Sequence, residues 1–144
     1  MSAKVDEISR GGDLIAIVIP TDYSAEDTRF FTPPDFSQQL AFIRKKAGTG
    51  IKEHTHKPNE RIVTFTQEVL VVRKGRVKVN LFDKDKVFIC DRILTEGDVI
   101  LLVSGGHGFE FLEDTELIEV KQGPYSGDDD KERFEGCLLD DTGE

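Results

Sequence analysis

The sequence lacks tryptophan, has one methionine, and holds only three histidines and two cysteines among its 144 residues. Ten Phe, together with Leu, Ile and Val, must therefore fill the interior. Cys90 and Cys137 show neither C-x-x-C nor zinc-ligand spacing. This spacing favours a reducing compartment over a disulfide-stabilised scaffold, and we expect Cys90 to be a core residue rather than a nucleophile.

Long apolar runs and basic clusters are also missing. The longest apolar runs, residues 14–19 and 99–103, are far too short to cross a bilayer, and no signal-peptide pattern opens the chain. We therefore expect a cytoplasmic protein without a membrane partner. The net charge of -9, with no Lys/Arg cluster interleaved with aromatic residues, argues against a nucleic-acid partner.

The length suits one domain, since a chain of this size buries roughly two-thirds of its unfolded surface. We expect an N-terminal extension over residues 1–12, a single domain over 13–123 and an acidic C-terminal tail over 124–144. The Asp triplet at 128–130 lacks the spacing of a calcium loop and is expected to be a solvated turn.

Short β-branched runs separated by turn residues predict an all-β fold, a barrel or sandwich. The predicted strands are residues 14–19, 39–45, 50–56, 62–65, 68–73, 77–82, 86–92, 98–103, 107–112 and 116–122. Lys74-Gly75 and residues 83–85 are predicted to be hairpin connections, and the Pro-rich residues 20–36 a surface excursion. The apolar run 14–19 could pair with a second subunit or cap the barrel of its own chain.

The three histidines carry the functional signal. His54 and His56 alternate along a predicted strand, so their side chains would project to one side. With Glu68 and His107 they offer three imidazoles and one carboxylate, a plausible set of ligands for a divalent metal.

These residues resemble the two paired motifs of the cupin superfamily over residues 38–123, namely Gly48-x5-His54-x-His56, Glu68-x6-Gly75 and Gly97-x7-Gly105-x-His107. The resemblance implies a double-stranded β-helix, or jelly-roll barrel, in which His54, His56, Glu68 and His107 hold one divalent metal. Residues 117–134 are further similar to the closing segment of WbuC-type cupin-fold metalloproteins from bacterial polysaccharide gene clusters.

The sequence departs from the cupin motifs in two places. Eleven residues separate His56 from Glu68, where three or four are usual, so Glu60 is a rival for the carboxylate ligand. We favour Glu68 because Glu68-x6-Gly75 reproduces the second half of the motif, whereas Glu60 follows turn-like sequence. The second motif reads Val103-Ser104-Gly105-Gly106-His107 where cupins commonly show a Pro and one more residue before the His. It also has Phe111 where an Asn is usual, which puts the local turn in doubt.

Imidazole and carboxylate suit iron, manganese, nickel, cobalt or zinc about equally. Such a centre would carry a charge of about +1 and favour an anionic oxygen ligand. If His107 and Glu68 face inward, strand alternation places Phe109, Phe111, Leu70 and Val72 along the pocket wall. Polar groups that could lie near the mouth are Gln39, Arg44, Lys52, Glu60 and Lys121.

Several functions fit this set of residues. The first is a metal-dependent cupin enzyme, an isomerase or oxygenase, acting on a small oxygenated or sugar-related substrate. The second is a binding or sensing module without catalysis, and the third is an empty barrel with a structural role. Metal-free sugar epimerases and isomerases share the cupin architecture, and in that case His54 or His107 would act as the base. The resemblance also implies a homodimer.

Overall fold

A computed structural model describes residues 3–136 and confirms the predicted all-β fold. Within that range the chain forms ten strands and one short 3-10 helix, η1 (Gly127–Asp130). The strands are β1 (Asp6–Arg10), β2 (Asp13–Ile19), β3 (Arg29–Phe30), β4 (Ala41–Phe42), β5 (Glu68–Lys74), β6 (Arg76–Phe82), β7 (Phe88–Thr95), β8 (Val99–Leu102), β9 (Gly106–Phe111) and β10 (Glu116–Lys121).

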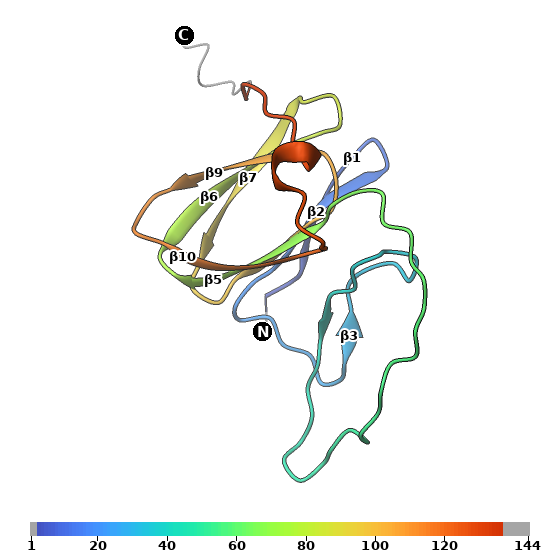
Figure 1. The fold of residues 1–144 in the computed structure, drawn as a ribbon. Helices are drawn as coiled ribbons and strands as arrows, with labels where there is room; N and C mark the ends of the chain where they lie inside the picture. The colour runs from blue at the N-terminus through green and yellow to red at the C-terminus, as the bar shows by residue number, and fades with distance from the viewer. Residues whose placement is uncertain (1–2, 137–144) are drawn as a thin grey trace.

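Two antiparallel sheets face each other (Figure 1). The first has five strands in the order β1-β2-β8-β5-β10, and the second has three in the order β7-β6-β9. Alternate residues of both sheets point inward and form the main core, in which Ile15, Val72, Val79, Leu81 and Ile100 are almost fully buried. Cys90, predicted to be a core residue, is partly buried and packs against the margin of this core. The described strands do not close into one barrel.

The outer face of the five-stranded sheet has its own apolar cover. Ile17, Val69 and Leu101 lie buried on this face, and side chains from the excursion between β2 and β4 pack over them. The covering residues include Tyr23, whose ring makes edge contacts with Phe31 and Phe42 at centroid distances of 5.3 and 5.2 Å. The Pro-rich excursion is thus a lid over one sheet face, with the small β3–β4 pair at its end.

The N-terminal run pairs within its own chain. β2 lies between β1 and β8, so both of its edges are occupied. β1, which falls in the expected N-terminal extension, was not predicted as a strand. The structure therefore uses residues 14–19 as an interior strand of its own sheet.

Two predicted strands, 50–56 and 62–65, are absent from the structure, and of 39–45 only Ala41–Phe42 forms a strand. Residues 43–66 instead form a long extended loop that leaves the two sheets after β4 and returns to β5, and every residue of it is exposed (Figure 1). A strand needs a hydrogen-bonded neighbour, and no other strand lies along this segment in the described structure. The sequence pattern alone could not supply that neighbour.

Gly75 joins the two sheets rather than closing a hairpin, so that prediction is wrong. β5 pairs with β8 and β10, while β6 pairs with β7 and β9. Gly75 has φ 96°, and a Cβ there would lie 2.3 Å from the Asp114 carbonyl oxygen. The loop between β9 and β10, which crosses back between the sheets, is therefore packed directly on this corner. The Leu112 N–H and the Thr115 hydroxyl both donate to the Arg76 carbonyl at 2.9 and 3.1 Å.

The turn at residues 83–85 joins the paired strands β6 and β7, as predicted. The Asp83 carboxylate accepts hydrogen bonds from the backbone N–H groups of Asp85 and Val87 at 2.9 and 3.0 Å. No described helix has the length and apolarity needed to span a bilayer. Cys137 and the end of the expected acidic tail, residues 137–144, lie outside the described residues.

The Gly75 corner can be tested with a matched glycine. Gly12 also has a positive φ, 85°, but a Cβ there would meet nothing within 4 Å. We expect Gly12→Ala to lower the free energy of unfolding by about 1–2 kcal/mol, because the only cost is that of holding an alanine at a positive φ. Gly75→Ala should cost about 1–3 kcal/mol more, because the methyl group displaces the Asp114 backbone. Urea unfolding of both variants measures the difference; equal losses would contradict the packed corner.

Candidate metal centre

Glu68 and His107 meet between the two sheets. Glu68 begins β5 and lies opposite Leu102 and Lys121, whereas His107 lies in β9 opposite Leu81. Leu81 and Leu102 belong to the main core, so both candidate ligands project inward. The His107 Nε2 to Glu68 Oε1 distance is 3.0 Å, and the side chains are 29% and 16% exposed.

Strand alternation holds for the predicted pocket wall. Leu70 and Val72 follow Glu68 into the main core, and Phe109 packs against the same core. The Phe109 ring lies 5.6 Å from the His107 ring and 6.4 Å from the Phe111 ring, which is stacked on it. Phe111 itself is exposed at the open side of the sandwich. His107 thus ends an aromatic row that leads from the core to the surface.

Local interactions favour the ionised form of Glu68. The hydrogen bond with His107 is the largest cause of the lowered pKa of Glu68, and the charges of His107, Lys121 and Lys131 lower it further. Burial opposes these effects and raises the pKa. The carboxylate is therefore available as an anionic donor at neutral pH.

His54 and His56 lie apart from this pair. Both are exposed in the segment 43–66, where their rings make an edge contact at a centroid distance of 5.2 Å. His54 Nδ1 lies 2.8 Å from the Lys52 carbonyl oxygen, a contact within the same segment. The structure thus brings together two of the four predicted ligands, and the other two lie beside each other elsewhere.

The spacing of Glu68 and His107 suits two neighbouring metal ligands. Donors about 2.1 Å from an octahedral ion and at right angles to each other are about 3.0 Å apart. The observed N-to-O distance is 3.0 Å. Among the described residues, however, no three His, Cys, Asp or Glu side chains are grouped. The pair therefore fits part of a metal site, and further donors must come from residues that do not lie beside it.

The remaining candidates divide between the site and the surface. Lys121 lies in register beside Glu68 and forms an ion pair with Glu119 at 3.4 Å. Glu60, Arg44 and Lys52 are exposed on the extended segment. Gln39 stabilises the excursion instead, since its side-chain amide donates to the Pro33 and Phe36 carbonyls at 2.9 Å.

The C-terminal segment contributes groups that the sequence did not signal. Lys131 acts electrostatically on Glu68, and the Thr66 hydroxyl donates to Asp130 Oδ2 at 2.9 Å. A shallow hollow beside the pair is lined by Phe65, Lys121, Tyr125 and Asp130 among others, but not by Glu68 or His107. Nothing in the local sequence around the Asp triplet indicates that it folds back next to β5.

Comparisons with protein-family models, with curated proteins and with solved structures found no match for this chain.

The pKa of Glu68 gives a pH prediction. A carboxyl whose pKa is lower in the folded state stabilises the fold above its unfolded pKa, and this contribution is lost as the pH falls through the folded pKa. With a chelator present, we expect Glu68→Gln to cost about 1.5–3 kcal/mol at pH 6, the value of a hydrogen bond to a charged group, and much less near pH 3. Urea unfolding across this range measures the difference.

The matched control is Glu7→Gln, at an exposed position of β1 whose carboxyl makes no hydrogen bond or ion pair shown in the described structure. We expect its effect to stay within about 0.5 kcal/mol. A constant offset for Glu68→Gln between pH 6 and pH 3 would show that its carboxylate does not carry the stabilisation.

Proposed function

We propose that this protein is a cupin-type metalloprotein that binds one divalent transition metal through Glu68, His107, His54 and His56. The contact between Glu68 and His107 carries the proposal. Two donors from different sheets are held at the spacing of adjacent ligands, with an apolar wall behind them. Iron, manganese, nickel, cobalt and zinc all accept this type of ligand.

The arrangement of the sheets supports a jelly-roll relationship. Two antiparallel sheets face each other, and the candidate ligands lie near the ends of strands that border the open side of the sandwich. In the structure β9 and β10 each have one unpaired edge among the described strands. Segment 50–56 would complete the donor set if it paired with β9 in the register that turns His54 and His56 inward beside His107.

The site suits a small anionic or sugar-related ligand. A divalent metal held by three imidazoles and one carboxylate would supply Lewis-acid stabilisation of an oxygen anion. Lys121, beside Glu68 in the sheet, would attract and orient a carboxylate or enolate oxygen. The Phe109 and Phe111 rings would exclude water from one side of the ligand. Isomerase and oxygenase chemistry are both compatible with these roles.

One observation favours a second, metal-free function. When His107 donates its Nε2 hydrogen to Glu68, its Nδ1 becomes the acceptor of the ring. A histidine oriented by a carboxylate in this way is suited to general-base catalysis, as expected for a cupin-type epimerase or isomerase. Turnover that persists in chelator and is lost in His107→Ala would favour this function over the metal site.

Metal titration tests the main proposal. We expect the purified protein to bind one Co²⁺ or Zn²⁺ ion per chain, measured by elemental analysis and calorimetry. Glu68→Gln and His107→Ala should each weaken binding by about 100-fold or more, since loss of a direct ligand exceeds the 10–100-fold effect typical of supporting residues. His54→Ala/His56→Ala should do the same.

Glu60→Gln is the matched control for Glu68→Gln, because both replace a carboxylate by its amide. We expect Glu60→Gln to bind metal like the unaltered protein. Loss of metal in the Glu60 variant alone would reassign the carboxylate ligand, and failure to take up any first-row divalent ion would refute the metal site.

A further inference from the structure

Residues 43–66 form an exposed arm, here called the basic arm. All 24 residues are exposed, including the large apolar residues Ile43, Ile51, Ile62, Val63 and Phe65. The hydrogen bonds, ion pairs and ring contacts that the structure shows for residues 45–65 join residues at most three apart in the chain. Connections this long without structure of their own are uncommon in compact domains, and they are usually either functional loops or linker segments.

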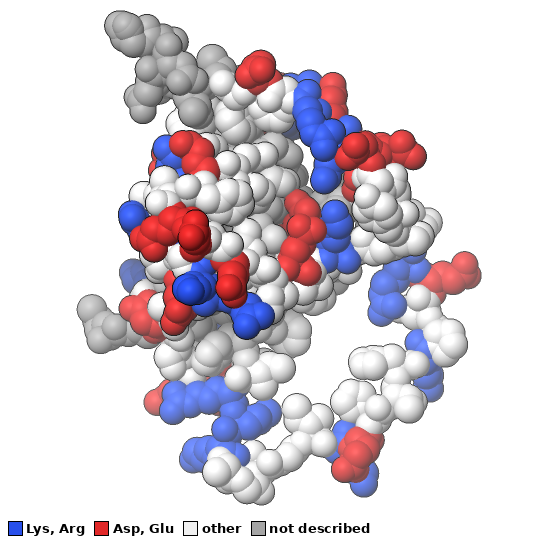
Figure 2. Space-filling model, turned by 60° about the vertical axis from the view of Figure 1, so that its left-hand side comes forward, with Lys and Arg blue, Asp and Glu red and all other residues white. Residues whose placement is uncertain are grey.

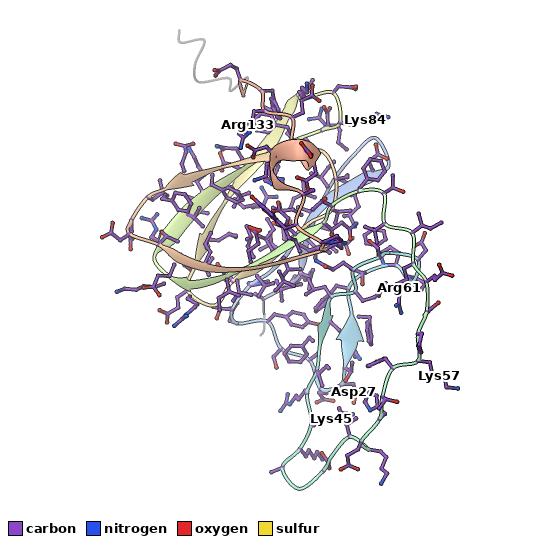
Figure 3. The ribbon with its side chains drawn as sticks, viewed as in Figure 1. Asp27, Lys45, Lys57, Arg61, Lys84 and Arg133 are labelled. Atoms are coloured by element: carbon purple, nitrogen blue, oxygen red, sulfur yellow. The ribbon has the colours of Figure 1, made fainter. Side chains whose placement is uncertain are left out.

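The arm has the opposite charge to the rest of the chain. It carries six of the 19 Lys and Arg residues but only two of the 28 Asp and Glu residues, which leaves 13 basic and 26 acidic residues elsewhere. Lys45 lies on the part of the arm that leaves β4, and Lys57 and Arg61 lie on the part that returns toward β5 (Figure 3). Figure 2 shows open space between the arm and the body, with basic side chains along the arm.

A surface of complementary character lies at the open side of the sandwich. We call residues 106–121 the acidic edge; they comprise β9, β10 and the loop between these strands. Its stretch 110–119 has five Asp and Glu residues and no Lys or Arg. Glu110 and Glu113 pair with Lys78 and Arg76, whereas Asp114 and Glu116 are exposed and make no ion pair shown in the described structure.

The acidic edge also leaves apolar surface uncovered. Ile17, Leu101, Val69 and Val120 lie opposite one another across the five-stranded sheet, so they share its outer face. The first three are buried under the excursion, but Val120 is 53% exposed and its neighbour Ile118 is 46% exposed. Phe111 is 59% exposed on the same side of the sandwich. The excursion therefore leaves the outer face of β10, the edge strand, uncovered.

Both strands of the acidic edge have backbone groups free to pair. Among the described strands, β9 pairs only with β6, and β10 pairs only with β5. An unpaired strand edge accepts an additional extended segment through its backbone hydrogen bonds. The basic arm is extended, apolar in part and opposite in charge to this edge.

We propose that two copies of this chain exchange their basic arms, each arm adding to the acidic edge of the other copy. The occupant is a second copy because the arm and its complementary surface belong to one sequence, which makes a two-fold symmetric contact self-consistent. In the single chain only residues 63–66 of the arm come near its own edge, at Lys121, and the rest of the arm lies away from that edge (Figure 1). An arm of 24 exposed residues also matches the 20–30 residues per side of a stable interface.

The exchange also bears on the proposed metal site. The part of the inference that concerns the metal donors rests on the proposed function. His54 and His56 of one copy would lie beside Glu68 and His107 of the other, so each site would draw its donors from both chains. The dimer contact itself depends only on the charge, the apolar surface and the free edges. The two ideas can therefore fail separately.

Zero-length cross-linking tests the exchange without any metal. Light and ¹⁵N-labelled protein are mixed in equal amounts, allowed to re-equilibrate at low concentration, and treated with a carbodiimide, which joins Lys to Asp or Glu. We expect Lys52 and Lys57 to cross-link to Asp114 and Glu116, with about half of the peptide pairs joining a light and a heavy chain. Peptide pairs from single chains only, or no arm-to-edge cross-links, would overturn the proposal.

Charge reversal tests the same contact in solution. Lys52→Glu/Lys57→Glu and Asp114→Lys/Glu116→Lys should each weaken dimerisation, measured by sedimentation equilibrium, by about tenfold or more. Combining the two reversals should restore it, whereas the reversal of Lys84, outside both surfaces, should have little effect. A monomer in the unaltered protein, or no rescue in the combined variant, would contradict arm exchange.

Complementation then separates the dimer from the metal site. Neither His54→Ala/His56→Ala nor Glu68→Gln/His107→Ala alone should bind Co²⁺ tightly, but an equal, re-equilibrated mixture should bind about one ion per four chains. The reason is that each mixed dimer regains one intact site. No recovery despite mixed cross-links would place the metal donors within one chain. Mixed cross-links without metal in the unaltered protein would refute the metal proposal and leave the exchange intact.

Discussion

The corner at Gly75 is the constraint on which the two-sheet arrangement depends. The chain passes from the five-stranded to the three-stranded sheet at this residue, and the loop between β9 and β10 crosses back directly over it. Hydrogen bonds to the Arg76 carbonyl hold the two crossings together. Glu68 lies on the strand that enters the corner, and His107 lies on the strand that leads to the returning loop. Their 3.0 Å contact is therefore set by the register of these two crossings.

The two open sides of the sandwich differ in the contacts that their strands make. On one side, β1 and β7 are linked by the Asp6–Arg92 ion pair, and Arg10 reaches Asp83 at 3.6 Å. At the end of β6, the ring of Phe134 packs on Phe82 at a centroid distance of 5.2 Å. The side formed by β9 and β10 has exposed apolar residues and unpaired edges among the described strands. This is also the side on which Glu68 and His107 lie, so the unpaired strand edges and the proposed pair of metal donors coincide.

The sequence predicted most strands because their apolar residues alternate and face a core inside one chain. β2, β5, β6, β8, β9 and β10 were expected within one or two residues of their observed bounds. Lys74-Gly75 was misread as a hairpin because a glycine turn signals a reversal but not which strands pair. Segment 50–56 alternates like a strand, yet pairing depends on a neighbour that local sequence does not specify. The same limit applies to the site: alternation correctly placed Leu70 and Val72 on the side of Glu68 but could not place His54 and His56.

The hydrogen bond between Glu68 and His107 and a metal ion would use the same two atoms, Oε1 and Nε2. Without an ion, each satisfies the other, so the half-buried carboxylate has a partner and the interior tolerates its charge. An ion between them would replace one N–H donor by a stronger charge while keeping a donor spacing of about 3.0 Å. The fold can therefore form without an ion, with these two side chains already positioned. The rest of the affinity for a metal ion would then depend on ordering the arm that carries His54 and His56. Metal binding would therefore be coupled to the pairing of that arm with a strand edge.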